Sequence, residues 1–191
     1  MSRKKTINDE FFPNKVCPVT GLQVLQRTEW TDVSFSKGCR VTLTVVGDNI
    51  LLVRSVGYAA LDDVKGTVAL IRRIVTEVFP GNRLYVQIDD FSNLRSTSVK
   101  GRKYYIEFME RRERLSGMIF YGTSLLLKVS IKLAKKLHVA SFDVEIVKDY
   151  PDAIRLAQKL LGGGRAVSHP ADVFNGDGPH HEAIANSEWC V

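Results

Sequence analysis

The chain is predicted to be an α/β protein, because short apolar strands alternate with longer amphipathic helices along most of its 191 residues. Near the amino-terminal side, the turn cluster Gly47-Asp48-Asn49 separates two β-branched apolar runs, which indicates a hairpin. Beyond it, segments with apolar residues at three- and four-residue spacing alternate with short apolar runs that are typical of buried strands. The expected order is ββαβαβαβα, in which a mixed sheet of about five strands packs with about four helices.

The first half of this pattern is a hairpin followed by a long helix. Strands are expected at residues 41–46 and 50–56, on either side of the turn cluster. The helix follows, and Pro80-Gly81 ends it. Its buried face is expected to hold the apolar residues that recur every three or four positions: Leu61, Val64, Val68, Ile71, Val75 and Val78.

In the second half, strands and helices alternate. The elements are expected, in order, at residues 84–88 (strand), 99–114 (helix), 117–122 (strand), 124–137 (helix), 142–147 (strand) and 151–161 (helix). A polar loop is expected to join the first two of these. Ser124 is at the N-cap position of the helix predicted at 124–137, and Pro151 is at the first position of the helix predicted at 151–161, where proline is favoured.

The ends of the chain differ from the middle in composition. Residues 1–40 lack clear periodicity and are expected to form an irregular lead-in that packs Phe11, Phe12 and Trp30 against the domain. Residues 162–191 are dominated by Gly, Pro, Asp and His, which predicts a flexible tail or linker. The predicted domain therefore spans residues 41–161.

Charge is distributed unevenly, with a net value of +6 for the whole chain. From residue 162 onward one basic residue stands against four acidic ones, so the positive charge lies on the body of the protein. Such a body could meet nucleic acid, acidic lipid or an acidic protein surface. In the helix predicted at 99–114, however, acidic residues alternate with basic ones, and ion pairs at helical spacing are the simpler account. This argues against nucleic acid as the partner.

The sequence also predicts a cytoplasmic protein without a membrane span. No apolar run approaches the ~20 residues that cross a bilayer, and no apolar segment follows the basic residues near the start, as a secretory signal would require. The three cysteines, Cys17, Cys39 and Cys190, are far apart and odd in number, which favours reduced thiols. Cys17-Pro18 is interpreted as a turn, since no second pair of ligands completes a zinc site.

The stretch IDDFSNLRSTSVKG, residues 88–101, contains the most informative polar residues. Asp89 and Asp90 follow a strand, at the edge where open α/β sheets bind ligands. A metal or phosphate-accepting site would need further acids at other strand ends, and no early strand ends in acids, so no metal is expected. The alternative is that Asp90 or Ser92 caps the turn by bonding backbone amides.

Hydroxyl side chains precede the helix predicted at 99–114. Ser96, Thr97 or Ser98 could be its N-cap. A phosphate added there would lie at the positive end of the helix dipole and close to Lys100, so a phosphorylation switch is also physically reasonable.

A second candidate site is the strand-to-helix segment Gly122-Thr123-Ser124, taken together with Asp89. Its layout is that of an anion cradle, but it lacks the fuller glycine patterns of phosphate-binding loops, so a capped turn is the other interpretation. No nucleophile–base pair, histidine cluster or HExxH motif is present, and the sequence therefore predicts neither an enzyme nor a cofactor.

The element order, together with Asp90-Phe91-Ser92-Asn93-Leu94, resembles the STAS domain, the fold of bacterial anti-sigma-factor antagonists and of the cytoplasmic tails of sulfate transporters. The resemblance covers roughly residues 41–161 and aligns Gly101 with the glycine of the family's D-S-S-G motif. The family's acid then falls on Ser98 and its phosphorylated serine on Val99, which cannot be phosphorylated. A shift of one or two residues would bring Ser98 into that role.

Longer strings, among them FFPNKVCPVTGL, EWTDV and IVKDYPDAIRLAQKLL, are similar to a domain found ahead of PAS modules and histidine kinases in bacterial signalling proteins. This resemblance implies a sensory or docking role in a two-component system. The implied partner is another signalling protein, a kinase or a regulator, or further domains of a kinase.

We therefore expect a non-enzymatic bacterial signalling module that docks a partner protein through residues 91–114. The residues expected to bind the partner or to act as a switch are Asp90, Ser92, Arg95, Ser96, Ser98 and Lys100. The alternative is a sensory domain that binds a small anion, nucleotide or lipid near residues 89–92 and 121–124.

Overall fold

The computed structural model describes residues 15–79, 81–123 and 143–162. Within these ranges the elements are β1 (Val24–Leu25), a 3-10 helix η1 (Thr28–Trp30), β2 (Cys39–Val46), β3 (Ile50–Ala59), α2 (Leu61–Val78), β4 (Tyr85–Thr97), α3 (Val99–Glu110), β5 (Leu115–Tyr121), β6 (Asp143–Ile146) and α5 (Tyr150–Gly162). The predicted alternation of strands and helices is confirmed.

The described strands form one mixed sheet whose spatial order, β1-β2-β3-β4-β5-β6, is the order along the chain. β1, β2 and β3 are antiparallel neighbours, whereas β3, β4, β5 and β6 run parallel. α2 joins β3 to β4, and α3 joins β4 to β5. Both crossovers advance in the same direction across the sheet, so the right-handed rule places both helices on the same face.

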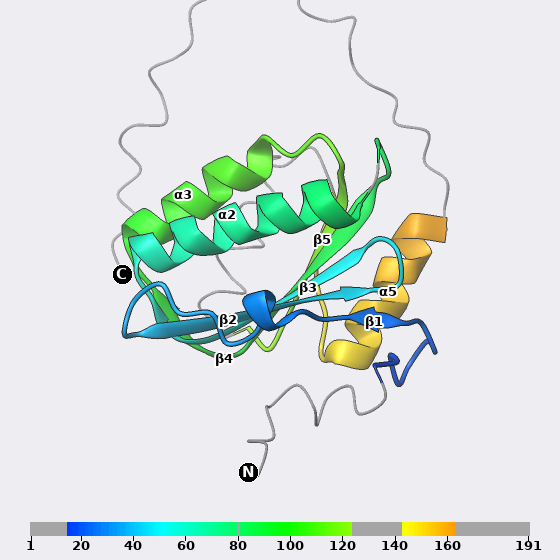
Figure 1. Ribbon diagram of the computed structural model, residues 1–191, viewed down its shortest axis with the longest axis horizontal. Helices are drawn as coiled ribbons and strands as arrows, with labels where there is room; N and C mark the ends of the chain where they lie inside the picture. Colours follow the sequence, from blue (N-terminus) through cyan, green and yellow to red (C-terminus); the bar gives the residue numbers. More distant parts are fainter. Residues whose placement is uncertain (1–14, 80, 124–142, 163–191) are drawn as a thin grey trace, which may run out of the picture.

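The helices form a layer on each face of the sheet. Figure 1 shows α2 and α3 side by side on one face and α5 on the other. Alternate residues of each central strand pack into these two layers, because successive side chains of a strand point to opposite faces. On β4, Tyr85 packs with Phe108 of α3 in one apolar cluster, while Val86 and Ile88 pack with Ile154 of α5 in the other.

The carboxyl ends of β4 and α3 differ most from the prediction. β4 continues through the predicted polar loop and ends at Thr97, because its backbone pairs with the far end of β3 as far as Ala59. α3 ends at Glu110 rather than at residue 114. The two-residue strand β1 was not expected, and the helix predicted at 124–137 lies outside the described residues.

The described part of the lead-in packs against the sheet. Trp30 is completely buried in the α2 and α3 layer, beneath the Arg27 guanidinium, which lies 4.7 Å from the ring centroid. Cys17 is buried in the α5 layer. Phe11, Phe12 and the segment 163–191 are outside the described residues, and the division of the chain at residues 41 and 161 stays a prediction.

In the part of the chain that the structure describes, no helix combines the length and the apolar character needed to cross a membrane. Nor do three or more His, Cys, Asp or Glu side chains gather there as a metal ion would require.

Candidate functional site

Asp89 and Asp90 do not form one carboxylate site, because they point to opposite faces of the sheet. Asp89 accepts a hydrogen bond from Tyr105 of α3, so it lies in the layer between the sheet and that helix. Asp90 is bonded to Arg54, which shares its face of β3 with Leu52 of the α5 layer. Both aspartates are almost completely buried, at 1% and 5% exposure. The period of two in a strand therefore separates two acids that are adjacent in sequence.

Asp89 belongs to a buried cluster with Gln87 and Tyr105. The Tyr105 hydroxyl donates to Asp89 Oδ2 at 2.8 Å, and Gln87 Nε2 donates to Asp89 Oδ1 at 2.9 Å. Burial raises the pKa of Asp89 to about 7, against the opposing effect of these two hydrogen bonds, and the nearby Asp90 charge adds to the rise.

Asp90 is held by a buried ion pair with Arg54. Its Oδ2 accepts a hydrogen bond from Arg54 Nε at 2.9 Å, and its Oδ1 accepts one from the backbone N–H of Ser92 at 2.9 Å. The second bond is the backbone capping that the sequence indicated for Asp90. The first was not expected, although an arginine inside the apolar run ILLVRSVG is a signal that could have been noticed.

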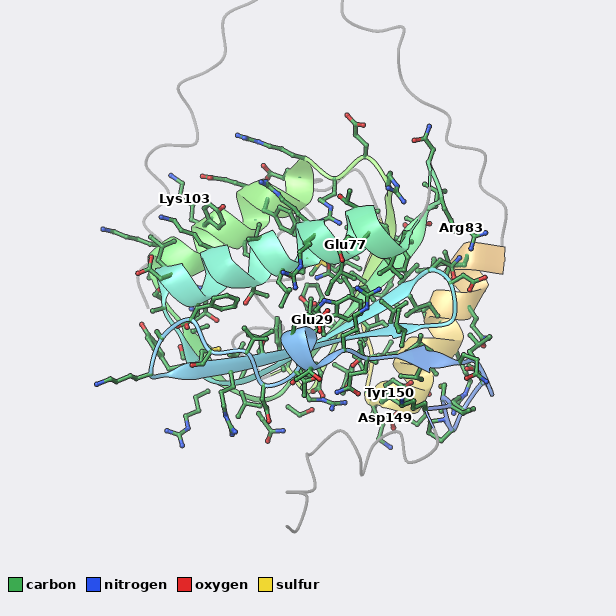
Figure 2. The ribbon with its side chains drawn as sticks, in the orientation of Figure 1. Glu29, Glu77, Arg83, Lys103, Asp149 and Tyr150 are labelled. Atoms are coloured by element: carbon green, nitrogen blue, oxygen red, sulfur yellow. The ribbon has the colours of Figure 1, made fainter. Side chains whose placement is uncertain are left out.

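Arg54, Asp90 and Tyr121 form a row across three parallel strands, since each is the register partner of the next. Burial, and next the Asp90 charge, raise the pKa of the Tyr121 hydroxyl. The Tyr121 ring lies 6.4 Å from that of Tyr150, at the start of α5 (Figure 2). This row connects the middle of β3 and of β4 and the end of β5 to the α5 layer.

The row continues to the lead-in through Tyr150, whose hydroxyl lies 3.1 Å from Cys17 Sγ. Burial acts to raise the pKa of the Cys17 thiol, but hydrogen bonds from Thr20, Tyr150 and the Val19 and Thr20 backbone hold it below its usual value. The Cys17-Pro18 turn thus attaches the lead-in to the start of α5.

The predicted anion cradle is only partly described. Gly122 has a φ of 67° and lies directly against Ser92, so its lack of a side chain has a packing reason. Thr123 is buried, and its Oγ1 has no hydrogen-bond partner among the described residues. Ser124 is outside them. The structure does not bring Asp89 together with Gly122 and Thr123 in an exposed site, because Asp89 is enclosed beneath α3.

The remaining predicted residues lie on or beside the surface. Ser92, Arg95, Ser96 and Lys100 are exposed. Ser98 is the N-cap of α3, and its Oγ accepts a hydrogen bond from the Gly101 N–H at 3.1 Å. Beyond Asp90, β4 pairs with β3, and within the described ranges no strand lies on its other side.

The exposed face of α3 contains apolar and charged side chains together. Val99 and Ile106 are 60% and 46% exposed, and they lie with Lys103 on one stripe of the helix because the spacing is four and then three residues. Figure 2 shows Lys103 projecting away from the sheet. We call the exposed residues Arg95, Ser96, Val99, Lys100, Lys103 and Ile106 the α3 surface.

The charged side chains of α3 make no ion pairs with the residues that the structure describes. Among the residues that the structure describes, no salt bridge involves Lys100, Lys103, Glu107 or Glu110. The ion pairs expected at helical spacing along this helix are therefore not formed among the described residues. Side chains at helical spacing can pair, but solvent competes for exposed charges and ordering two long side chains is costly.

Comparison with known proteins identifies the fold. No protein-family model matches the chain, and no curated protein does. A similar solved structure is that of an uncharacterized protein of the DUF3478 family from Shewanella loihica PV-4, described as having a SpoIIAA-like fold. The two superpose with a TM-score of 0.51 at 14% sequence identity, over 65% of this chain and 98% of the other. The chain therefore has a SpoIIAA-like, that is STAS-like, α/β fold.

Proposed function

We propose that the protein is a non-enzymatic signalling module that binds a partner protein through residues 91–114, with the α3 surface as the centre of the contact. The partner is expected to be another signalling protein, a kinase or a regulator, or further domains of a kinase. The SpoIIAA-like fold and the resemblance to STAS domains and to PAS-associated modules support this assignment.

The observation that carries the proposal is the combination of exposed apolar groups on α3 with exposed charges, on α3 and on the adjoining end of β4, that form no ion pair among the described residues. Val99 and Ile106 expose apolar area that a partner could bury. Arg95, Lys100 and Lys103 carry positive charge with no ion-pair partner among the described residues, so they are available to steer an acidic surface.

Phosphorylation would have to use a hydroxyl in this same region. Val99 occupies the position of the STAS phosphoserine, and the Ser98 hydroxyl caps α3. Ser96 is an exposed hydroxyl next to Arg95. A phosphate on Ser98 stays a prediction of the resemblance, and one on Ser96 stays a prediction from the helix dipole and the nearby Lys100.

Binding of a small anion, nucleotide or lipid near residues 89–92 and 121–124 remains the alternative. The two carboxylates of that region are buried and already hydrogen-bonded within the protein. Docking of a partner protein is favoured over ligand binding because the residues of the α3 surface are exposed.

The test is charge reversal on the α3 surface. The Arg95→Glu/Lys100→Glu double variant should bind the partner at least about tenfold more weakly, because two attractive charges become repulsive. The partner is first captured from the lysate of the organism's own cells and identified by mass spectrometry. The dissociation constant is then measured with both proteins purified.

Lys65→Glu/Lys159→Glu is the matched control, since it makes the same charge change at exposed lysines of α2 and α5. It should bind within about twofold of the wild type at physiological salt, where distant charges are screened. Equal weakening by both double variants would mean that net charge, and not the α3 surface, governs binding. Unchanged binding by the Arg95/Lys100 variant, with an unchanged circular dichroism spectrum, would contradict the proposal.

A further inference from the structure

The cluster of Gln87, Asp89 and Tyr105 joins α3 to the middle of the sheet. Besides the two bonds to the Asp89 carboxylate, Gln87 Nε2 donates to the Tyr105 hydroxyl oxygen at 2.6 Å. Gln87 is completely buried and Asp89 is 1% exposed, so water does not reach the carboxylate while α3 is in place. Ionising a carboxyl group in such a position costs free energy, so the stability of the packing between α3 and the sheet depends on whether Asp89 is protonated.

The hydrogen atoms of this cluster match an ionised carboxylate. The two Nε2 hydrogens of Gln87 and the hydroxyl hydrogen of Tyr105 account for its three hydrogen bonds. Gln87 Oε1 is buried and has no hydrogen-bond partner in the part of the chain that the structure describes. Turning the amide about its axis would present Oε1 as an acceptor to a protonated Asp89. The cluster can therefore hold Asp89 in either state.

Among the described residues Asp89 makes no salt bridge, and the nearby Arg54 is bound to Asp90. Burial raises the pKa of Tyr105 well above its usual value, and its hydroxyl therefore stays protonated through the neutral range. Asp90 adds a negative charge from the next position of β4.

The cations of this layer, Arg72 and Arg112, lie over the Phe108 ring and form no salt bridge with Asp89. The register partners of Asp89 are uncharged: Val53 on β3 and Phe120 on β5. On α2 the buried carboxylate of Asp63 is engaged with Ser36 and the Ala60 N–H. An ionised Asp89 is therefore stabilised chiefly by its two hydrogen bonds.

We propose that the Gln87–Asp89–Tyr105 cluster is a proton-dependent anchor for α3, which packs firmly when Asp89 is protonated and opens more readily when it is ionised. The proposal rests on the proposed function in one respect: protonation of Asp89 would regulate partner binding only if α3 is the helix that docks the partner. A partner that needs α3 in its packed position would then bind more tightly in mildly acidic conditions.

The sign follows from proton linkage. With α3 packed, the pKa of Asp89 is about 7. With α3 lifted away, the carboxylate is hydrated and its pKa returns to about 4. The packed state therefore binds the proton more tightly, and its advantage is fully present below pH ~4 and is lost as the pH rises to about 7. The equilibrium constant for opening should increase by up to about tenfold per pH unit within this window and level off above it.

Hydrogen exchange on the purified protein tests this inference. The amides of α3 should exchange faster at pH 7 than at pH 5.5, by about tenfold or more after correction for the intrinsic pH dependence of exchange. Asp89→Asn keeps the size of the side chain and, like the protonated acid, presents one accepting and one donating group. It cannot ionise, so it should remove this pH dependence. Glu107→Gln, at an exposed acid of α3, should retain it.

The proposal would be overturned if the corrected exchange rates of the α3 amides did not change with pH in the wild type. It would also be overturned if they changed with pH in Asp89→Asn as they do in the wild type. If Asp89→Asn does not fold, the carboxyl carbon of Asp89 can be titrated by NMR in the wild type. A midpoint near 7 would support the proposal, and one near 4 would overturn it. These measurements need no partner, so they can support the anchor even if charge reversal at Arg95 and Lys100 does not affect docking. Equally, charge reversal can weaken docking even if the exchange of α3 does not depend on pH.

Discussion

Replacing Arg54 with methionine should lower the free energy of unfolding by about 3–5 kcal/mol at pH 7, since Asp90 would be left buried without its cation. The two side chains are 7% and 6% exposed, and the Nε–Oδ2 distance is 2.9 Å. Neither charge can recover hydration while the sheet is intact. Chemical denaturation monitored by circular dichroism measures the loss.

The exposed pair Arg83–Asp48 provides the control. Its N–O distance is 3.3 Å, but its side chains are 47% and 83% exposed. Arg83→Met should therefore cost less than about 1 kcal/mol. Equal effects of the two substitutions would contradict the burial argument.

A double variant separates the ion pair from the packing of its side chains. Arg54→Met/Asp90→Leu removes both charges, so it should recover a large part of the stability lost by Arg54→Met alone.

Gly122→Ala should lower the free energy of unfolding by about 2–4 kcal/mol, for two separate reasons. The positive φ of 67° disfavours any residue with a Cβ, at a cost of about 1–2 kcal/mol. The added Cβ would also meet Ser92, lying against its Oγ and N and 2.6 Å from its Cα. Two of these three atoms are backbone, so the end of β5 would have to move away from β4 at Ser92.

Gly21→Ala isolates the first of these effects. Gly21 has a φ of 70°, and a Cβ there would meet nothing within 4 Å. Its substitution should cost about 1–2 kcal/mol, and the difference between the two variants measures the contact with Ser92. A Gly122→Ala protein as stable as Gly21→Ala would contradict this, because it would show that the end of β5 moves away from Ser92 at little cost.

Much of the fold could be predicted because its periodicities are strong. The apolar spacing of α2, from Leu61 to Val78, and the hairpin around Gly47 are local patterns, and both elements are found where expected. β4 could not be delimited in this way. Its residues beyond Asp90 are mostly polar, and they are extended because the backbone of β3 pairs with them.

The candidate site was predicted less completely. The sequence indicates Asp89 and Asp90 as candidate site residues, and the Asp90 bond to the Ser92 N–H agrees with the expected capping. Their partners Arg54 and Tyr105 were missed, because each lies at least 16 residues away along the chain. Lone polar residues in otherwise apolar segments, such as Gln87 in LYVQI, were the available signal.

The sequence by itself determined the order of strands and helices and the residues that could carry chemistry, since both depend on local spacing and side-chain type. Only the tertiary structure decided what Asp89 and Asp90 do. Alternation along β4 directs one acid beneath α3 and the other onto Arg54, while the register of β3, β4 and β5 aligns Arg54, Asp90 and Tyr121. These are pairings across strands and layers, and no single segment of the chain contains the information that specifies them.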